Sequence, residues 1–265
     1  MSEIIFNSVS SKDIGIEIET FPEYIIPEKN VDSYEIPGRN GSIVIDHGTF
    51  KNVDLSYKVS AVAQNGDYSA TMHRIAAWLF SPSGYARLED TYDSECYRMA
   101  KCSSSMTFSN IFNEAGQATI KFNAMPQRYL KIGETSVDYE ATYGKTKKVN
   151  IFNPTLFTAK PLVCLRDVGF YKTDVYGSFL LLKINGIEVK ISLNETTWTD
   201  KKDVYYDFED KHIYTVKYGV IKNITGNAAV DGFKSNIELK PGDNVIEYSS
   251  INYASLSIIP RWWTI

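Results

Sequence analysis

Short segments in which apolar and polar residues alternate recur along the chain, and this feature constrains the fold more than any other. Residues 55–62 alternate between apolar and polar, as a half-buried β-strand does. Residues 179–184 and 187–193 flank Asn185-Gly186, a dipeptide typical of a two-residue β-hairpin turn. Because such strands bury one face only when a second layer covers it, the pattern predicts packed antiparallel sheets.

The first half of the chain is predicted to be mostly β with one helix. Apolar residues in 31–36 and 43–45 lie on either side of a turn sequence, which predicts a hairpin. Residues 85–92 and 95–102 predict a second hairpin, and residues 118–123 alternate as a further strand does. The turn of the first hairpin is Pro37, Gly38, Arg39, Asn40 and Gly41.

The hydrophobic period changes within residues 68–80. Apolar residues recur there at helical spacing, and Ser81-Pro82 follows as a stop signal, so we predict one helix. The predicted core face of this helix consists of Met72, Ile75, Ala76 and Leu79. Trp78 lies off that face and admits two interpretations: it packs beneath a loop of its own chain, or it contacts another subunit.

The second half is predicted to be nearly all β. Regularly spaced strands separated by turn residues favour a sandwich of antiparallel sheets. Residues 131–150 are polar without a buried-face pattern, which suggests a linker or the entry into a second domain. We therefore expect one domain over residues 1–130 and another over 131–265. Besides the Asn185-Gly186 hairpin, the predicted strands are residues 204–208, 213–216, 233–239, 244–248 and 255–260, the last extended by Arg261-Trp262-Trp263.

Composition and charge exclude several classes of protein. The 265 residues are 43% hydrophobic and 23% charged, which is typical of a globular protein and excludes wholesale disorder. The net charge of −4 argues against a basic nucleic-acid binder. Residues 1–130 hold 11 basic and 16 acidic residues, a balance of −5. The three cysteines argue against a disulfide scaffold, and neither a signal peptide nor membrane insertion is expected.

The sequence contains no complete catalytic, nucleotide or metal motif. Gly144-Lys145-Thr146 resembles the end of a P-loop, but Tyr139 stands where the first glycine belongs. The three histidines, His47, His73 and His212, lie in no zinc signature, and nothing forces the cysteines to converge on a metal. The carboxylate pairs Glu17/Glu19 and Asp207/Glu209 are more typical of a solvated sheet face than of a glycosidase. We therefore predict no enzyme activity and no cofactor, although scattered Ser, His and Asp residues leave a catalytic triad open.

A series of short strings, taken in order, resembles the distal tail proteins of phages with long non-contractile tails. The resemblance covers most of the chain and is weakest in residues 1–30 and 163–235. The strings are 36–41 (IPGRNG), 46–48 (DHG) with Tyr57, 75–79 (IAAWL) with Gly84, 93–100 with Tyr97 and Ala100, 122–129 (FNAMPQRY), 150–155 (NIFNPT), 159–162 (AKPL), 240–244 (KPGDN) and 260–265 (PRWWTI).

The resemblance implies a non-enzymatic hub protein of the virion tail tip, assembled in the host cytoplasm. Residues 1–130 would form a hexameric ring around a channel for DNA, and residues 131–265 would be a galectin-like sandwich pointing outward. Expected partners are further copies of the chain, the tail tube protein, the tape-measure protein, and the tail-tip fibre, tail-associated lysin or baseplate proteins. The acidic balance of residues 1–130 fits a channel wall to which DNA does not adhere, or equally an ordinary acidic surface.

Candidate site residues follow from the same resemblance. It places the ring in the N-terminal domain, so the hairpin tip Pro37, Gly38, Arg39, Asn40 and Gly41, together with Trp78, are candidate inter-subunit contacts. The polar strand motif of galectins is absent after His212. Trp198 is a candidate sugar contact through ring stacking, and a core or rim position is the favoured alternative for it. Two other functions stay open. An exposed aromatic platform would indicate a carbohydrate-binding module for host recognition, and a convergent acid or metal site would indicate a tail-tip enzyme such as a peptidoglycan hydrolase.

Overall fold

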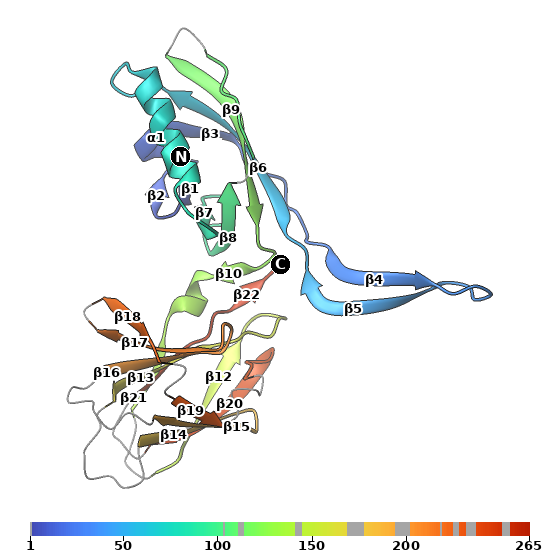
Figure 1. Cartoon of the computed structure of the whole chain (residues 1–265), viewed down its shortest axis with the longest axis vertical. Coiled ribbons are helices and arrows are strands. Elements are labelled where there is room, and N and C mark those ends of the chain that lie inside the picture. Colours follow the sequence, from blue (N-terminus) through green and yellow to red (C-terminus); the bar gives the residue numbers. More distant parts are fainter. Residues whose placement is uncertain are drawn as a thin grey trace. The chain divides into compact units, whose positions relative to one another are not determined.

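The computed structural model describes residues 2–102, 104–110, 114–140, 145–168, 178–193, 202–217, 219–224, 228–231, 237–250 and 255–265. The chain divides into two compact units (Figure 1). The N-terminal unit consists of residues 1–129 with Ile265, and the C-terminal unit consists of residues 130–264. Each unit has its own hydrophobic core.

The N-terminal unit is built on an antiparallel sheet in the strand order β2-β1-β7-β8-β9-β6-β3. A separate two-stranded sheet pairs β4 with β5. The elements are β1 (Ile4–Phe6), β2 (Val9–Ser10), η1 (Lys12–Ile14), β3 (Ile16–Thr20), β4 (Lys29–Glu35), β5 (Ser42–Phe50), β6 (Val53–Val62), α1 (Tyr68–Phe80), β7 (Ala86–Asp90), β8 (Cys96–Cys102), β9 (Ala115–Ala124) and β10 (Arg128–Leu130).

The alternation in β6 places one face of that strand in the core. Its odd-numbered residues from Val53 to Ala61 are buried, and they share a cluster with Ile120 and Phe122 of the neighbouring β9. Helix α1 begins at Tyr68, as predicted. Asp67 caps it, since its carboxylate accepts a hydrogen bond from the Ala70 amide at 2.9 Å. The hairpin of β7 and β8 is confirmed by their antiparallel pairing.

The buried face of α1 is rotated from the predicted one. Ile75 and Leu79 are buried as expected, but Ala76 is exposed and Met72 only half-buried. Trp78 is buried instead, with Thr71 on the same side of the helix. Size explains the difference, because burying the indole removes far more apolar surface from water than burying a methyl group.

The C-terminal unit is a sandwich of two sheets. The six-stranded sheet has the order β11-β21-β13-β16-β17-β18, and the five-stranded sheet has the order β12-β20-β14-β15-β19. The elements are η2 (Lys131–Glu134), β11 (Val137–Tyr139), β12 (Lys147–Asn153), β13 (Leu162–Val168), β14 (Ser178–Ile184), β15 (Ile187–Leu193), β16 (Lys202–Asp207), β17 (His212–Lys217), β18 (Val220–Asn223), β19 (Ala228–Asp231), β20 (Gly242–Ser250), β21 (Ser255–Ile259) and β22 (Trp263–Thr264).

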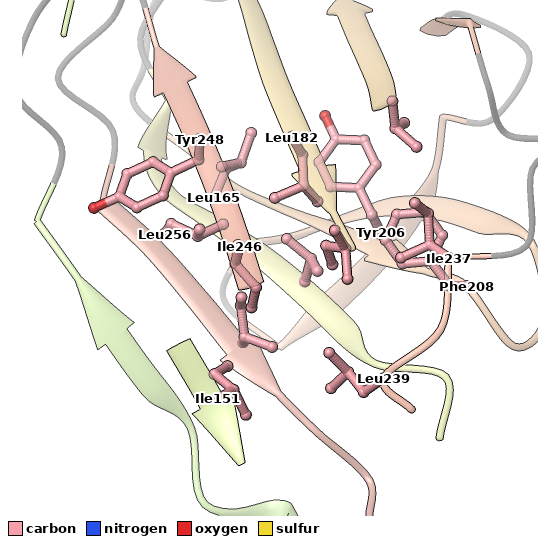
Figure 2. Close-up of a cluster of buried hydrophobic side chains, with 14 of the residues drawn as sticks. Ile151, Leu165, Leu182, Tyr206, Phe208, Ile237, Leu239, Ile246, Tyr248 and Leu256 are labelled. Atoms are coloured by element: carbon pink, nitrogen blue, oxygen red, sulfur yellow. The ribbon is translucent and has the colours of Figure 1, made fainter. Parts of the chain in front are cut away.

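The core of this unit lies between the two sheets (Figure 2). Leu182 and Ile246 come from the five-stranded sheet, and Leu165, Tyr206 and Leu256 from the six-stranded sheet. The mainly β fold, with one helix in the described N-terminal residues followed by a sandwich, is therefore confirmed. The galectin-like character of the sandwich stays a prediction.

Three sequence predictions for this unit need correction or completion. Of the two alternatives for residues 131–150, the described residues 131–140 and 145–150 fit the entry into a second domain rather than a linker, since they hold η2, the strand β11 that pairs with β21, and the start of β12. For the strand predicted over 233–239, residues 232–236 lie outside the described residues, and Leu239 forms an isolated bridge with Ala159. The final strand ends at Ile259 rather than continuing to Trp263, because Arg261 has a positive φ of 59° that breaks the extended backbone.

Candidate subunit interface on the β4–β5 arm

The strands β4 and β5 form a hairpin, here called the arm, that extends away from the other strands of the N-terminal unit (Figure 1). Cross-strand pairing runs from Lys29 opposite Phe50 at the base to Glu35 opposite Ser42 at the tip. A register shift between Lys29 and Val31 marks a bulge at the base, where Gly48 has a φ of +69°. No arm residue belongs to either core cluster of the described residues.

The tip of the arm follows from its sequence. The Arg39 amide donates to the Ile36 carbonyl at 3.1 Å, which closes a four-residue turn. Pro37 occupies the second position and Gly38 the third, where φ is +82°. That arrangement is a type II turn, which favours proline and then glycine at these two positions. The five predicted tip residues, Pro37 to Gly41, are all exposed.

The arm exposes apolar side chains on both faces. Residues directly opposite each other share a face, so Tyr34 and Ile43 lie together with Ile45 on one side. These three side chains are 53%, 38% and 48% exposed. Val31 and Val44 lie on the other face. An isolated two-stranded hairpin is at best marginally stable in water, so exposed β-branched residues on such an arm indicate a surface that another chain covers.

An ion pair and a hydrogen bond connect the strands near the base. Lys29 Nζ lies 3.1 Å from Asp46 Oδ2 in the ion pair, and His47 Nε2 lies 2.9 Å from Asp32 Oδ2 in the hydrogen bond. The backbone N–H of Gly48 donates to the other carboxylate oxygen of Asp46 at 2.8 Å. This hydrogen bond, followed by the contact with Lys29, lowers the pKa of Asp46. These polar groups therefore interact with one another within the arm. The exposed apolar side chains of the arm have no such partners and are the surface available to another chain.

Trp78 is a core residue of its own unit. It is 6% exposed, its ring packs edge-on against Phe6, and its Nε1–H donates to the Phe6 carbonyl at 3.0 Å. This burial favours the interpretation in which Trp78 packs within its own chain over contact with another subunit. The remaining candidate, Trp198, lies outside the described residues, so the sugar-binding alternative stays a prediction.

The other chemical candidates lie on different elements of the two units. His47 is on the arm, His73 on α1 and His212 on β17, and no group of three possible metal ligands occurs among the described residues. Glu17 and Glu19 are exposed on β3, as a solvated sheet face predicts. Asp207 is instead buried in an ion pair with Arg261. Within the described part of the chain, no helix is both long and apolar enough to cross a membrane.

Comparisons with known proteins show which family the N-terminal residues resemble. Residues 9–124, which include the arm, match the family described as the phage tail protein RIFT-related domain. A sequence comparison with curated proteins finds no match.

Among solved structures, the SPP1 Dit protein is similar over 100% of both chains, with a TM-score of 0.66 at 11% identity. It is described as a paradigm of the hub adsorption apparatus in phages that infect Gram-positive bacteria. A chain of the phage P2 baseplate in its activated conformation with Ca is similar over 97% of both chains, with a TM-score of 0.55 at 11% identity. The same baseplate with Sr gives a TM-score of 0.59 at 12% identity, over 97% of this chain and 96% of that one.

These findings agree with the strings of residues that resemble distal tail proteins. At such low identity the solved structures establish the fold, whereas the family match concerns residues 9–124 directly. The resemblance to siphophage distal tail proteins is thus confirmed: residues 9–124 match the phage tail RIFT-related domain family, and the chain has the fold of the SPP1 Dit protein.

Proposed function

We propose that this chain is a non-enzymatic structural component of a phage tail tip, where it forms a hexameric hub ring. The observation that carries the proposal is the arm, a two-stranded sheet with exposed apolar residues on both faces. A ring is built from heterologous contacts, in which one patch of each subunit meets a different patch of the next. The arm is such a patch, with the face of Tyr34, Ile43 and Ile45 against the neighbouring copy and the tip residues Pro37 to Gly41 at its end.

The two units have different roles in this proposal. Residues 1–130 close the ring around a channel through which DNA passes, and their charge balance of −5 keeps the phosphates from adhering to the wall. Residues 131–265 face outward. The ring joins the tail tube to the tail-tip fibre or baseplate, as expected of a hub. The SPP1 Dit protein, which has a similar fold, is described as a hub and supports this role.

Light scattering on the full chain after size-exclusion chromatography tests the ring. We expect a species of six times the chain mass whose population rises with concentration, and ring-shaped particles in negative-stain images. Combining Tyr34→Ser, Ile43→Thr and Ile45→Thr should remove the ring and leave the melting temperature of the monomer within about 2 °C, because these side chains belong to no core.

A matched control uses apolar residues elsewhere that are more exposed than those of the arm. Val220 and Ile221 on β18 are 69% and 68% exposed, and Val220→Thr with Ile221→Thr should leave the ring intact. A chain that stays monomeric at high concentration, and also forms no ring with its tail-tip partner, would contradict the hub proposal. Assembly driven by residues 131–265 alone would show that the roles of the two units are reversed.

A further inference from the structure

A small cavity in the N-terminal unit is lined by two buried arginines that have no part in the proposed ring contact. It has a volume of about 40 Å³ and lies beside β6, the loop after β7 and the segment of residues 22–24. Arg98 of β8 and Arg128 of β10 both line it. A space of this size holds a small polar group or a few waters, which excludes a sugar or a nucleotide.

Arg98 is only 6% exposed. Its Nη1 donates to the carbonyl oxygens of Met125 and Pro126, at 3.2 Å and 3.3 Å. Its Nη2 is buried and finds no hydrogen-bond partner in the described part of the chain. A guanidinium has five N–H donors and no means of losing its charge at neutral pH, so a buried nitrogen without an acceptor indicates a missing partner.

Arg128 shows the same deficit. It is 9% exposed, and its Nη1 donates to Asp93 Oδ2 at 2.9 Å. The guanidinium lies over the ring of Tyr24, 3.8 Å from the ring centre. Its Nε is buried, and the described residues offer it no acceptor. Each of the two arginines therefore has one buried guanidinium nitrogen without an acceptor among the described residues, and both side chains line the same cavity.

Two of the three acids of the cavity wall, Asp90 and Asp93, already have hydrogen-bond or ion-pair partners, and the third, Glu23, is exposed. Asp90 accepts hydrogen bonds from the Tyr57 hydroxyl at 2.8 Å and from the backbone N–H groups of Tyr92 and Asp93, at 3.0 Å and 2.9 Å. Asp93 pairs with Arg128, and Glu23 is the other carboxylate in the lining. Burial, with a contribution from the charge of Arg128, lowers the pKa of Arg98 to about 10, which fits a positive charge that lacks a counter-ion.

We propose that this cavity is a carboxylate-binding site in which Arg98 Nη2 and Arg128 Nε are the donors. A carboxylate has two acceptor oxygens in a plane and makes short, charge-assisted hydrogen bonds to arginine. The carboxylate comes either from a small free acid or from an acidic side chain of a second copy of this chain. A water-filled cavity, or one that takes any anion, is the competing outcome.

Nitrogen-15 NMR of the arginine Nε–Hε groups in the full chain tests the proposal, with sodium acetate as the probe. Acetate supplies an acceptor to Arg128 Nε, so the signal lost in Arg128→Lys should shift saturably in the wild type. The melting temperature should rise by roughly 2–4 °C at an acetate concentration ten times the dissociation constant. Arg98→Met should abolish both responses, whereas Arg87→Met, on the neighbouring strand and outside the lining, should keep them.

The outcomes are distinguishable. A shift that appears with acetate alone assigns the site to a free acid. A shift that appears without acetate as the protein concentration rises assigns it to a side chain of a second copy. Equal shifts with sodium chloride or inorganic phosphate at the same ionic strength would overturn the carboxylate assignment. The absence of a saturable shift in any arginine signal of the wild-type chain would overturn the site itself, whether or not the variants fold.

Discussion

Arg261 holds Asp207 through two parallel hydrogen bonds, from Nη1 to Oδ1 at 2.8 Å and from Nη2 to Oδ2 at 2.7 Å. The pair joins the end of β16 to the segment before β22, where the backbone of Arg261 has a φ of 59°. The Asp207 side chain is 8% exposed. Burial alone would raise the pKa of Asp207, but the hydrogen bonds and charge of Arg261 outweigh it and lower the pKa.

Asp207→Asn should destabilise the chain by up to about 3–5 kcal/mol, because it leaves the half-buried charge of Arg261 with only the more exposed Glu209 as a partner. Glu209→Gln is the control. Glu209 lies 3.6 Å from Arg261 with its side chain 41% exposed, so its removal should cost less than about 1 kcal/mol. Urea unfolding measures both values, and similar losses for the two variants would contradict the role assigned to Asp207.

The same pair predicts acid sensitivity. The pKa of Asp207 is lowered in the folded chain, so its contribution to stability is complete above the pKa of an unfolded aspartate, about 3.9. That contribution is lost as the pH falls from there through the folded-state pKa. Urea unfolding at a series of pH values should show a shallower acid decline for Asp207→Asn than for the wild type. Parallel curves would show that Asp207 is not a source of the decline.

Gly133 is required by a close approach of two backbone segments. A Cβ at this position would lie 2.4 Å from the Trp262 nitrogen, which real structures do not tolerate. Gly133→Ala should therefore destabilise the C-terminal unit by about 1–3 kcal/mol through overpacking. Gly84 is a suitable control, because a Cβ there meets nothing within 4 Å and its φ is ordinary. Calorimetry should show a loss for Gly133→Ala and none for Gly84→Ala.

Substitution of the buried Trp78 distinguishes a role in the core from a role in a subunit interface. Trp78→Phe removes the N–H that satisfies the buried Phe6 carbonyl, which should cost about 1–3 kcal/mol of monomer stability. Phe80 on the same helix is 52% exposed, so Phe80→Ala should change stability by less than about 1 kcal/mol. A Trp78→Phe chain that unfolds like the wild type but no longer assembles would show that the indole acts at a subunit contact.

The two consecutive tryptophans near the C-terminus differ in burial. Trp262 is 5% exposed in the sandwich core, and Trp262→Ala should cost about 3–5 kcal/mol. Trp263 is half-buried, stacked on Phe157 at 4.5 Å, with its Nε1–H donating to the Thr158 carbonyl at 3.0 Å. Trp263→Ala should therefore lower the melting temperature clearly less. Equal shifts for the two variants would contradict this difference.

The three cysteines are free thiols with low predicted reactivity. Burial, followed by the charge of Asp93, raises the pKa of Cys96 to about 11. Burial, followed by the charge of Asp203, raises the pKa of Cys164 to about 11, and burial also raises that of Cys102. For Cys96 and Cys164, only about one thiol in a thousand is thiolate, the reactive form, at pH 8. Iodoacetamide should label the native chain much more slowly than the chain in urea, and fast labelling of native Cys164 would contradict its burial.

Local chemistry determined the parts of this protein that the sequence predicts well. Asn185 and Gly186 adopt φ values of 49° and 85°, and Pro37 with Gly38 forms a type II turn, because these residues themselves favour such conformations. The helix follows Asp67 and ends before Pro82 for equally local reasons. The alternation in β6 predicted its buried face for the same reason, since the period of a strand is fixed by its own backbone.

Only the tertiary structure decided what covers each apolar segment. Ile43, Val44 and Ile45 form an apolar run typical of a buried strand, yet they lie exposed on the arm, because the arm contributes no residue to the core of the described N-terminal unit. Trp78 is buried although its helical position does not predict it, and residues 131–150 enter two sheets despite their polarity. Arg98 and Arg128 are thirty positions apart in the sequence, yet both line one cavity. Burial depends on partners distant in the chain, and a single segment carries no information about its partners.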